Sequence, residues 1–233
     1  MITLRPSGER GHGNYGWLDT RYSFSFANYF DREHMGFRDL RVINEDWIAA
    51  GQGFGSHPHQ DMEILTYIVE GELSHRDSTG REAAIKPGDV QRMSAGTGVV
   101  HSEYNNSQAP VHLLQIWIMP EAKGLPASYE DRTFARGEKL NQLRLIASHE
   151  GRQNSTKINQ DASVYAAMLE GGKSLEHDLA PGRHAWVQLI NGTLEVNGTK
   201  LSKGDGAAVS GEPKLQIANA AGNEAEFLLF DLN

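Results

Sequence analysis

ILTYIVEG (Ile64–Gly71) and WVQLING (Trp186–Gly192) are short apolar segments that each run into a glycine turn. VHLLQIWIM (Val111–Met119) is a third segment of this kind, rich in β-branched and aromatic residues and stopped by Pro120. Turn signals such as KPGD (Lys86–Asp89) separate these segments, and few stretches follow the 3.6-residue period of a helix. Short strands joined by frequent turns predict an all-β sandwich or barrel.

The second half of the chain repeats this pattern. Asn197-Gly198 is a strong hairpin signal, and the turn Lys203–Asp205 resembles the earlier turn Pro87–Asp89. We therefore predict two tandem β-barrels of similar topology, each a jelly roll or double-stranded β-helix. The polar stretch 129–141 is the expected crossing, which gives an N-terminal domain over residues 1–130 and a C-terminal domain over residues 131–233.

Two pairs of potential metal ligands stand out in the first half. His57 and His59 flank Pro58, and His101 and Glu103 flank a serine. Residues i and i+2 of a strand point to the same face, so each pair can direct two side chains toward one point. Three imidazoles and one carboxylate suit Fe(II), Mn(II), Ni(II) or Zn(II). We predict that these four residues bind one metal; the alternative is four polar residues on a solvated rim.

The repeat supplies an internal control for this prediction. Counted from the matching turn glycines, the four ligand positions correspond in the second half to Asp178, Ala180, Ile217 and Asn219. The second barrel therefore lacks the ligand set, and a barrel can be formed without it. We predict one metal in the N-terminal barrel and none in the C-terminal one.

Composition limits the classes of partner and chemistry. The chain has 233 residues and a formal net charge of −8, and it contains no cysteine. Binding to nucleic acid needs clustered Lys and Arg, which the sequence lacks, so we expect no direct nucleic-acid partner. Thiolate metal sites and cysteine nucleophiles are excluded. The start, Met1–Pro6, has no apolar signal-peptide core, and the apolar runs are short, so we expect a cytoplasmic protein without a membrane span, and a monomer.

The chain resembles the pirin family of the bicupin superfamily, and is similar to bacterial pirin-like proteins with quercetin 2,3-dioxygenase activity. The resemblance runs through the first half and is specific in the combination of its motifs; the second half matches only in pattern. The motifs that carry it are Gly16–Asp19 (GWLD), Phe24–Tyr29 (FSFANY), Leu40–Asn44 (LRVIN), His57–His59 (HPH), Ser94–Gly98 (SAGTG), His101–Glu103 (HSE) and Gln115–Trp117 (QIW).

The resemblance implies a fold of two cupin barrels and a metal held by His57, His59, His101 and Glu103. It implies iron or another divalent metal; we favour Fe(II), with Ni, Mn, Zn, Cu and Co as alternatives. The general cupin pattern takes its carboxylate from the first motif, near Glu63, whereas the pirin pattern takes it from the second. We follow the pirin pattern and expect Glu63 to support the site or the fold.

The resemblance further implies a dioxygenase that opens the flavonol ring of quercetin-like substrates and releases carbon monoxide. In this mechanism Glu103 accepts the proton of the 3-hydroxyl group, as metal ligand and catalytic base. The main alternative is a non-enzymatic regulator whose iron state switches binding of a protein partner. A metal-dependent isomerase or hydrolase ranks third, because the resemblance includes the N-terminal segment as well as the ligands.

The aromatic segment and the remaining histidines have less specific interpretations. The aromatic segment around Phe24, Phe26 and Phe30 predicts core packing or a lid, with stacking on a flavonol as the alternative. His75 and His112 are interpreted as ordinary barrel histidines. The remaining histidines have no partner at ligand spacing, and His34 is the least certain of them.

Overall fold

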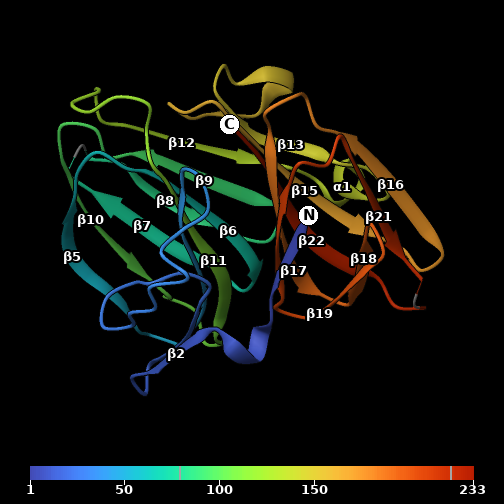
Figure 1. Cartoon of the computed structure of the whole chain (residues 1–233). Coiled ribbons are helices and arrows are strands. Elements are labelled where there is room, and N and C mark those ends of the chain that lie inside the picture. Colours follow the sequence, from blue (N-terminus) through green and yellow to red (C-terminus); the bar gives the residue numbers. More distant parts are fainter. Residues whose placement is uncertain (79, 221) are drawn as a thin grey trace. The chain divides into compact units, whose positions relative to one another are not determined.

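The computed structural model of this protein describes residues 1–78, 80–220 and 222–233. These residues are almost entirely in strands and turns, as predicted (Figure 1). The chain divides into two compact units. We call Gly11–Thr133 with Thr156–Gln160 the N-barrel, and Met1–Arg10 with Phe134–Ser155 and Asp161–Asn233 the C-barrel. Each unit thus contains a short segment from the other half of the chain: Met1–Arg10 belongs to the C-barrel, and Thr156–Gln160 belongs to the N-barrel.

The N-barrel is built from two antiparallel sheets. The larger has the strand order β12-β9-β6-β11-β4-β3-β2 and the smaller has the order β5-β10-β7-β8. The strands of this unit are β2 (Gly11–Asn14), β3 (Leu18–Tyr22), β4 (Leu40–Ile48), β5 (Gly53–His59), β6 (Glu63–Glu70), β7 (Leu73–Asp77), β8 (Glu82–Ile85), β9 (Asp89–Ser94), β10 (Val99–Tyr104), β11 (Val111–Ile118), β12 (Ser128–Thr133) and the short β14 (Thr156–Lys157).

The C-barrel has the same construction. Its larger sheet contains the order β1-β20-β17-β22-β15-β13, and its smaller sheet the order β16-β21-β18-β19. Its elements are β1 (Ile2–Arg5), η1 (Ser7–Glu9), α1 (Arg136–Lys139), β13 (Arg144–Ser148), η2 (Arg152–Asn154), β15 (Ala162–Leu169), β16 (Lys173–Asp178), β17 (His184–Asn191), β18 (Thr193–Val196), β19 (Thr199–Ser202), β20 (Gly206–Ser210), β21 (Lys214–Asn219) and β22 (Ala225–Leu232).

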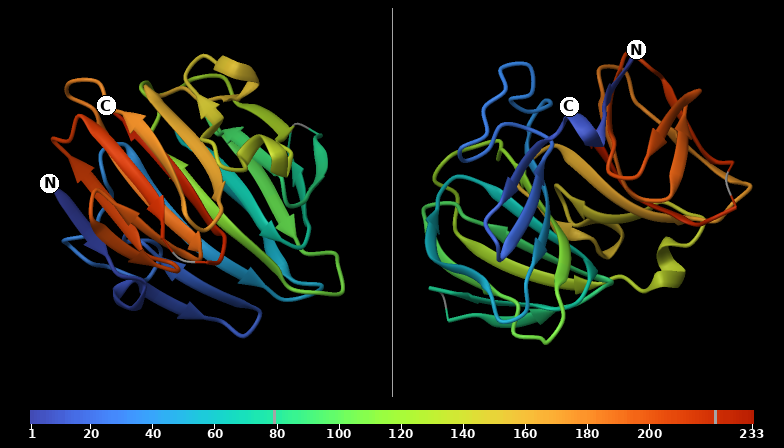
Figure 2. Two further views of the ribbon diagram at one scale, coloured as in Figure 1. Left: turned by 90° about the vertical axis from the view of Figure 1, so that its right-hand side faces the viewer. Right: turned by 90° about the horizontal axis from the view of Figure 1, so that it is seen from below.

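The two units share one topology. The order β5-β10-β7-β8 corresponds strand for strand to β16-β21-β18-β19, and β9-β6-β11-β4-β3 corresponds to β20-β17-β22-β15-β13. The strands of each unit can be followed by colour in Figure 2. The predicted all-β fold of two similar tandem barrels is therefore confirmed.

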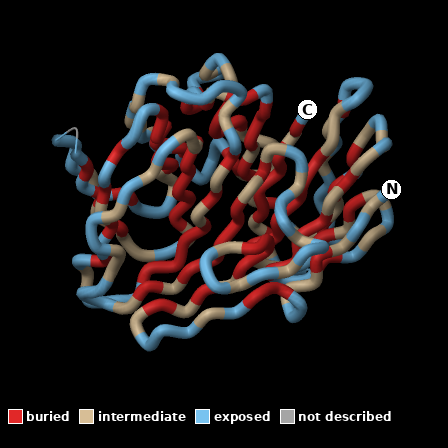
Figure 3. Tube along the Cα trace, turned by 60° about the vertical axis from the view of Figure 1, so that its left-hand side comes forward, coloured by how far each residue is buried: buried red, intermediate tan, exposed pale blue. Residues whose placement is uncertain are grey.

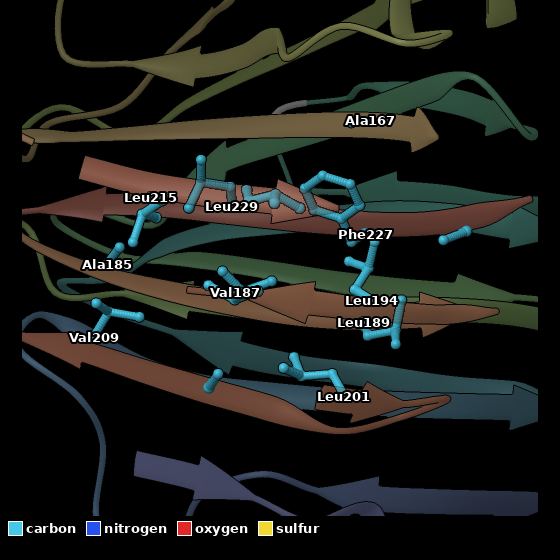
Figure 4. Close-up of a cluster of buried hydrophobic side chains, with 14 of the residues drawn as sticks. Ala167, Ala185, Val187, Leu189, Leu194, Leu201, Val209, Leu215, Phe227 and Leu229 are labelled. Carbon is cyan, nitrogen blue, oxygen red and sulfur yellow. The ribbon is translucent and has the colours of Figure 1, made fainter. Parts of the chain in front are cut away.

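Burial follows the strands, and the connecting loops are mostly exposed (Figure 3). In the C-barrel, the alternate residues Ala185, Val187 and Leu189 of β17 pack against Leu215 and Phe227 of neighbouring strands (Figure 4). These residues belong to one continuous apolar core, in which full burial of a Val, Leu or Phe side chain contributes about 1.5–3 kcal/mol. The interior of the N-barrel differs, because polar side chains occupy part of it.

Candidate metal centre

Strands β5 and β10 bring the two predicted ligand pairs together. In their antiparallel register, His57 lies opposite His101. The register then shifts by one residue before Glu103, which lies opposite Phe54, so β5 contains a bulge at this point. Gly53 allows β5 to approach β10 closely, because a Cβ atom there would lie 2.2 Å from the carbonyl oxygen of Glu103. The spacing in the sequence and the pairing of the strands thus place the side chains at one site.

The three imidazoles meet as metal ligands would. One ring nitrogen from each of His57, His59 and His101 lies within 4.8 Å of the others, and His101 Nε2 is 3.0 Å from His57 Nε2. Two nitrogens that each lie about 2.1 Å from one metal, at an angle of about 90°, are about 3 Å apart. The donor atoms and their separation therefore fit a divalent transition metal.

The protonation of the imidazoles also suits a metal. His57 Nδ1 lies 2.8 Å from the carbonyl oxygen of Gly55, which fixes the proton on Nδ1 and leaves Nε2 free to bind. Burial, with the neighbouring histidines, lowers the pKa of His59 to about 4 and that of His101 to about 3. Both rings are neutral at neutral pH, so metal binding there displaces no proton.

Glu103 lies beside this group, held by two amides. Gln91 Nε2 donates to its Oε1 at 3.0 Å, and Gln115 Nε2 donates to its Oε2 at 2.9 Å. Tyr129 in turn donates its hydroxyl hydrogen to Gln91 Oε1. Glu103 is buried and forms a second cluster of close ligand atoms, with His75 and His101. The four predicted ligands are thus neighbours. Glu103 shares a cluster of close ligand atoms with His101 but not with His57 or His59.

His75 is a site residue that the sequence reasoning missed. Its Nδ1 lies 3.5 Å from His101 Nδ1, and its Nε2 lies 3.2 Å from Asp77 Oδ2, with both side chains buried. The order Asp77–His75–His101 resembles the carboxylate–histidine chains that orient metal ligands. His75 and Asp77 are themselves an i, i+2 pair on β7, the same spacing that revealed the ligand pairs.

A cavity of about 470 Å³ opens onto two of the imidazoles, those of His57 and His59. Its lining combines aromatic rings with polar side chains: Trp17, Phe26, Asn44, Asp46, Gly53, Phe54, Gly55, His57, His59, Glu103, Gln115 and Trp117. Its volume lies within the range of about 300–1,000 Å³ typical of small-molecule sites. The rings of Phe26 and Trp117 meet edge to face, and Trp117 also meets the ring of His59. The arrangement can hold a flat aromatic molecule against the imidazoles.

Glu63 and His34 lie outside both clusters of ligand atoms. Glu63 accepts hydrogen bonds from Ser94 Oγ at 2.7 Å and from Asn159 Nδ2 at 2.9 Å, and it belongs to neither ligand cluster. His34 pairs with Asp31 at 2.7 Å.

The phenylalanines of the aromatic segment lie in three different environments. Phe24 is buried in the core, Phe26 lines the cavity and Phe30 is largely exposed. The segment is therefore neither only core nor only lid.

Strand registers correct the sequence-based match between the barrels. His101 pairs with His57, whereas Leu215 pairs with His177; Glu103 pairs with His75, whereas Ile217 pairs with Val196. The counterparts of His57, His101 and Glu103 are thus His177, Leu215 and Ile217. The earlier match to Asp178, Ile217 and Asn219 was wrong, by one residue at the first position and by two at the other two. Counting from turn glycines could not detect that the connections between corresponding strands differ in length, as between β5 and β6 and between β16 and β17.

Comparison with known proteins identifies the family. The family model described as Pirin matches residues 3–118, and the model described as Quercetinase C-terminal cupin domain matches residues 145–232. A quercetin 2,3-dioxygenase of Escherichia coli (strain K12) is 48% identical over 233 residues, which cover 100% of this chain and 99% of the relative. The chain belongs to the pirin family. The resemblance stated from the sequence is confirmed, and the relative's name agrees with the expected type of enzyme.

Solved structures of pirins agree with this fold. The crystal structure of YhhW from Escherichia coli matches with a TM-score of 0.96 and 47% identity, covering 100% of this chain and 98% of that chain. A second structure, of bacterial pirin YhhW in complex with nickel(II), matches with a TM-score of 0.94 and 47% identity, covering 100% and 99% of the two chains. In the ranges that the present structure describes, no helix is long and apolar enough to cross a membrane.

Proposed function

We propose that this pirin-family protein is a metal-dependent dioxygenase that opens the flavonol ring of quercetin-like substrates and releases carbon monoxide. The observation that supports it most is the cluster of His57, His59 and His101 beside an aromatic-lined cavity of about 470 Å³, whose wall includes His57, His59 and Glu103. The name of the Escherichia coli relative, at 48% identity over the whole chain, supports the same activity. Dioxygen is the second substrate.

The proposed ligands are His57, His59, His101 and Glu103, and Fe(II) is the metal we favour. Mixed imidazole and carboxylate sets are typical of such metals, and the nickel(II) complex of YhhW supports a site of this chemistry. A metal held there would bind the enol oxygen of the flavonol and lower the pKa of its 3-hydroxyl group.

Glu103 is the proposed base for the 3-hydroxyl proton. Its two oxygens accept hydrogen bonds from Gln91 and Gln115, which orient the carboxylate. A carboxylate oxygen has a second lone pair, so each oxygen keeps the capacity to accept a proton or bind a metal. The aromatic rings of Phe26, Phe54 and Trp117 then shield the flavonolate from water.

The overall reaction balances without a further co-reactant. Both atoms of dioxygen enter the ring-opened ester, two carbon–carbon bonds of the heterocycle break, and the carbon between them leaves as carbon monoxide. The flavonol supplies all the electrons that dioxygen accepts. The protein therefore needs to hold the substrate, remove one proton and exclude water.

The test is direct. Metal-loaded protein with quercetin under air should remove the flavonol absorbance and evolve carbon monoxide, and metal-free protein should not. Glu103→Gln should lower kcat by about 10²–10⁴-fold, the usual contribution of general acid–base catalysis. Metal content, measured on the same samples, distinguishes loss of the base from loss of the metal. Full activity of Glu103→Gln with metal bound would refute the assignment of the base.

A further inference from the structure

The cavity beside the imidazoles has a polar wall on strand β4. Asn44 and Asp46 are an i, i+2 pair, so their side chains leave the same face of the strand, and both line the cavity. Each is only 4% exposed. Neighbouring Gln115, opposite Asn44 in the register, turns its amide toward Glu103 and is already used. Asn44 and Asp46 are thus polar groups that the proposed chemistry does not employ.

Both side chains offer buried oxygens that lack a donor. Within the described part of the chain, Asn44 Oδ1, Asp46 Oδ1 and the indole nitrogen of Trp117 are buried and have no hydrogen-bond partner. Such groups are rare in folded proteins, because a buried polar atom without a partner loses its hydration and gains nothing. All three residues line the same cavity. The cavity is therefore bordered by polar residues whose hydrogen-bonding capacity the fold does not fully use.

The charge around Asp46 also favours a ligand that donates hydrogen bonds. Burial raises the pKa of Asp46 to about 7; the Thr20 hydroxyl, opposite Asp46 on β3, acts against this rise, and the carboxylates of Glu103 and Glu45 add to it. A hydroxyl group that donates to this carboxylate offsets its lost hydration, whereas an anionic ligand adds a further repulsion. The rest of the lining includes the rings of Trp17, Phe26 and Phe54, which suit an aromatic body.

We propose that Asn44 and Asp46 form a hydroxyl-recognition subsite, which binds the phenolic hydroxyl groups of a polyhydroxylated aromatic substrate while its enol end lies at the imidazoles. This inference rests on the proposed function and makes it more specific, because it names the substrate feature that the cavity selects. Hydrogen bonds to substrate hydroxyls discriminate strongly, since an analogue without them leaves the buried acceptors unpaired.

The test compares two probes on metal-loaded protein without dioxygen. Quercetin carries phenolic hydroxyls on both outer rings, and 3-hydroxyflavone carries only the enol hydroxyl. Dissociation constants follow from quenching of tryptophan fluorescence, because Trp17 and Trp117 line the cavity. Wild-type protein should bind quercetin more tightly, and Asp46→Leu and Asn44→Leu should each lower that preference about tenfold. Asp46→Asn keeps an acceptor and should retain part of the preference.

Stability supplies a second readout. Removal of the buried, unpaired Asn44 oxygen should leave the melting temperature of ligand-free Asn44→Leu unchanged or raise it, as expected where stability is given up for function. The control Asp19→Leu removes a carboxylate from neighbouring β3, outside the cavity, and should keep the wild-type preference.

Three results would overturn the subsite: equal affinity of the two probes for wild-type protein, no binding of quercetin, or an unchanged preference in the Leu variants and in Asp46→Asn. Should a Leu variant fail to fold, the preference of Asp46→Asn decides. Failure of the proposed function has a different signature. Wild-type protein would then select quercetin over 3-hydroxyflavone, and the selectivity would fall in the variants, but quercetin would survive in air.

Discussion

His101 is the residue on which the candidate centre depends most, because its two ring nitrogens face different partners. Nε2 lies 3.0 Å from His57 Nε2, on the side of the ligand cluster. Nδ1 lies 3.5 Å from His75 Nδ1, and Asp77 lies beyond His75. A proton on His101 Nδ1 that points toward His75 leaves Nε2 as the metal-binding atom. The orientation of His101, with Nε2 toward the other ligands, therefore depends on His75 and Asp77.

We predict that His75→Phe and Asp77→Asn lower metal affinity about 10–100-fold, because they remove the partners that orient His101. Competition with a chelator of known affinity measures the change. Arg76→Ala, an exposed residue on the same strand, serves as control and should keep wild-type affinity. Unchanged affinity in both His75→Phe and Asp77→Asn would mean that His101 is oriented by other contacts.

At the residue scale, sequence could reveal pairs but not the contacts between pairs. The spacing of His57 with His59, and of His101 with Glu103, is visible because i, i+2 geometry is local. His75 has a partner at the same spacing, Asp77, but its significance depends on the pairing of β7 with β10, which joins residues distant in the chain. Asn44 and Asp46 escape notice for the same reason.

At the scale of the element, the approach of β5 to β10 decides the position of the ligands. The two strands pair around a bulge, and Gly53 lies where β10 passes closest. The bulge adds one residue to β5. His57 and Phe54 are three residues apart on β5, yet they lie opposite His101 and Glu103, which are two residues apart on β10. Turns and apolar runs in the sequence predicted the strands. They do not predict the bulge, because glycine, the residue that often marks a bulge, is common throughout this segment.

Two glycines of β5 give a matched pair of variants. A Cβ at Gly53 would lie 2.2 Å from the Glu103 carbonyl oxygen, whereas a Cβ at Gly55 would have its nearest neighbour, the Tyr104 hydroxyl, at 3.8 Å. Gly53→Ala should therefore destabilise the protein by about 1–3 kcal/mol, because β5 and β10 must move apart. Gly55→Ala should be neutral or slightly stabilising, since it restricts the unfolded chain without a clash.

Denaturant unfolding and metal affinity measure both effects. The Gly53 variant should also bind metal more weakly, because the separated strands hold His57 and His101 farther apart. Equal stability of the two variants would show that the strands can separate at little cost, and the close approach would then not explain the glycine.

At the scale of the whole molecule, one topology carries two kinds of interior. Where the N-barrel has His101 and Glu103, the C-barrel has Leu215 and Ile217, which are fully buried in its apolar core. His177, the counterpart of His57, lies 2.9 Å from Asp231 Oδ2. Among the described residues, the clusters of close ligand atoms are both in the N-barrel. An apolar core is the less costly interior, because buried polar groups need partners.

We therefore predict one metal ion per chain, bound in the N-barrel. Elemental analysis of freshly purified protein should give a ratio near one, and His101→Ala should reduce it to near zero, because His101 belongs to both ligand clusters. His177→Ala is the matched control, since it removes the C-barrel counterpart of a proposed ligand and should leave the ratio unchanged. A ratio of two, or loss of metal on His177→Ala, would place metal chemistry in the C-barrel. That result would contradict the inference from Leu215 and Ile217, because neither side chain has an atom that binds a metal ion.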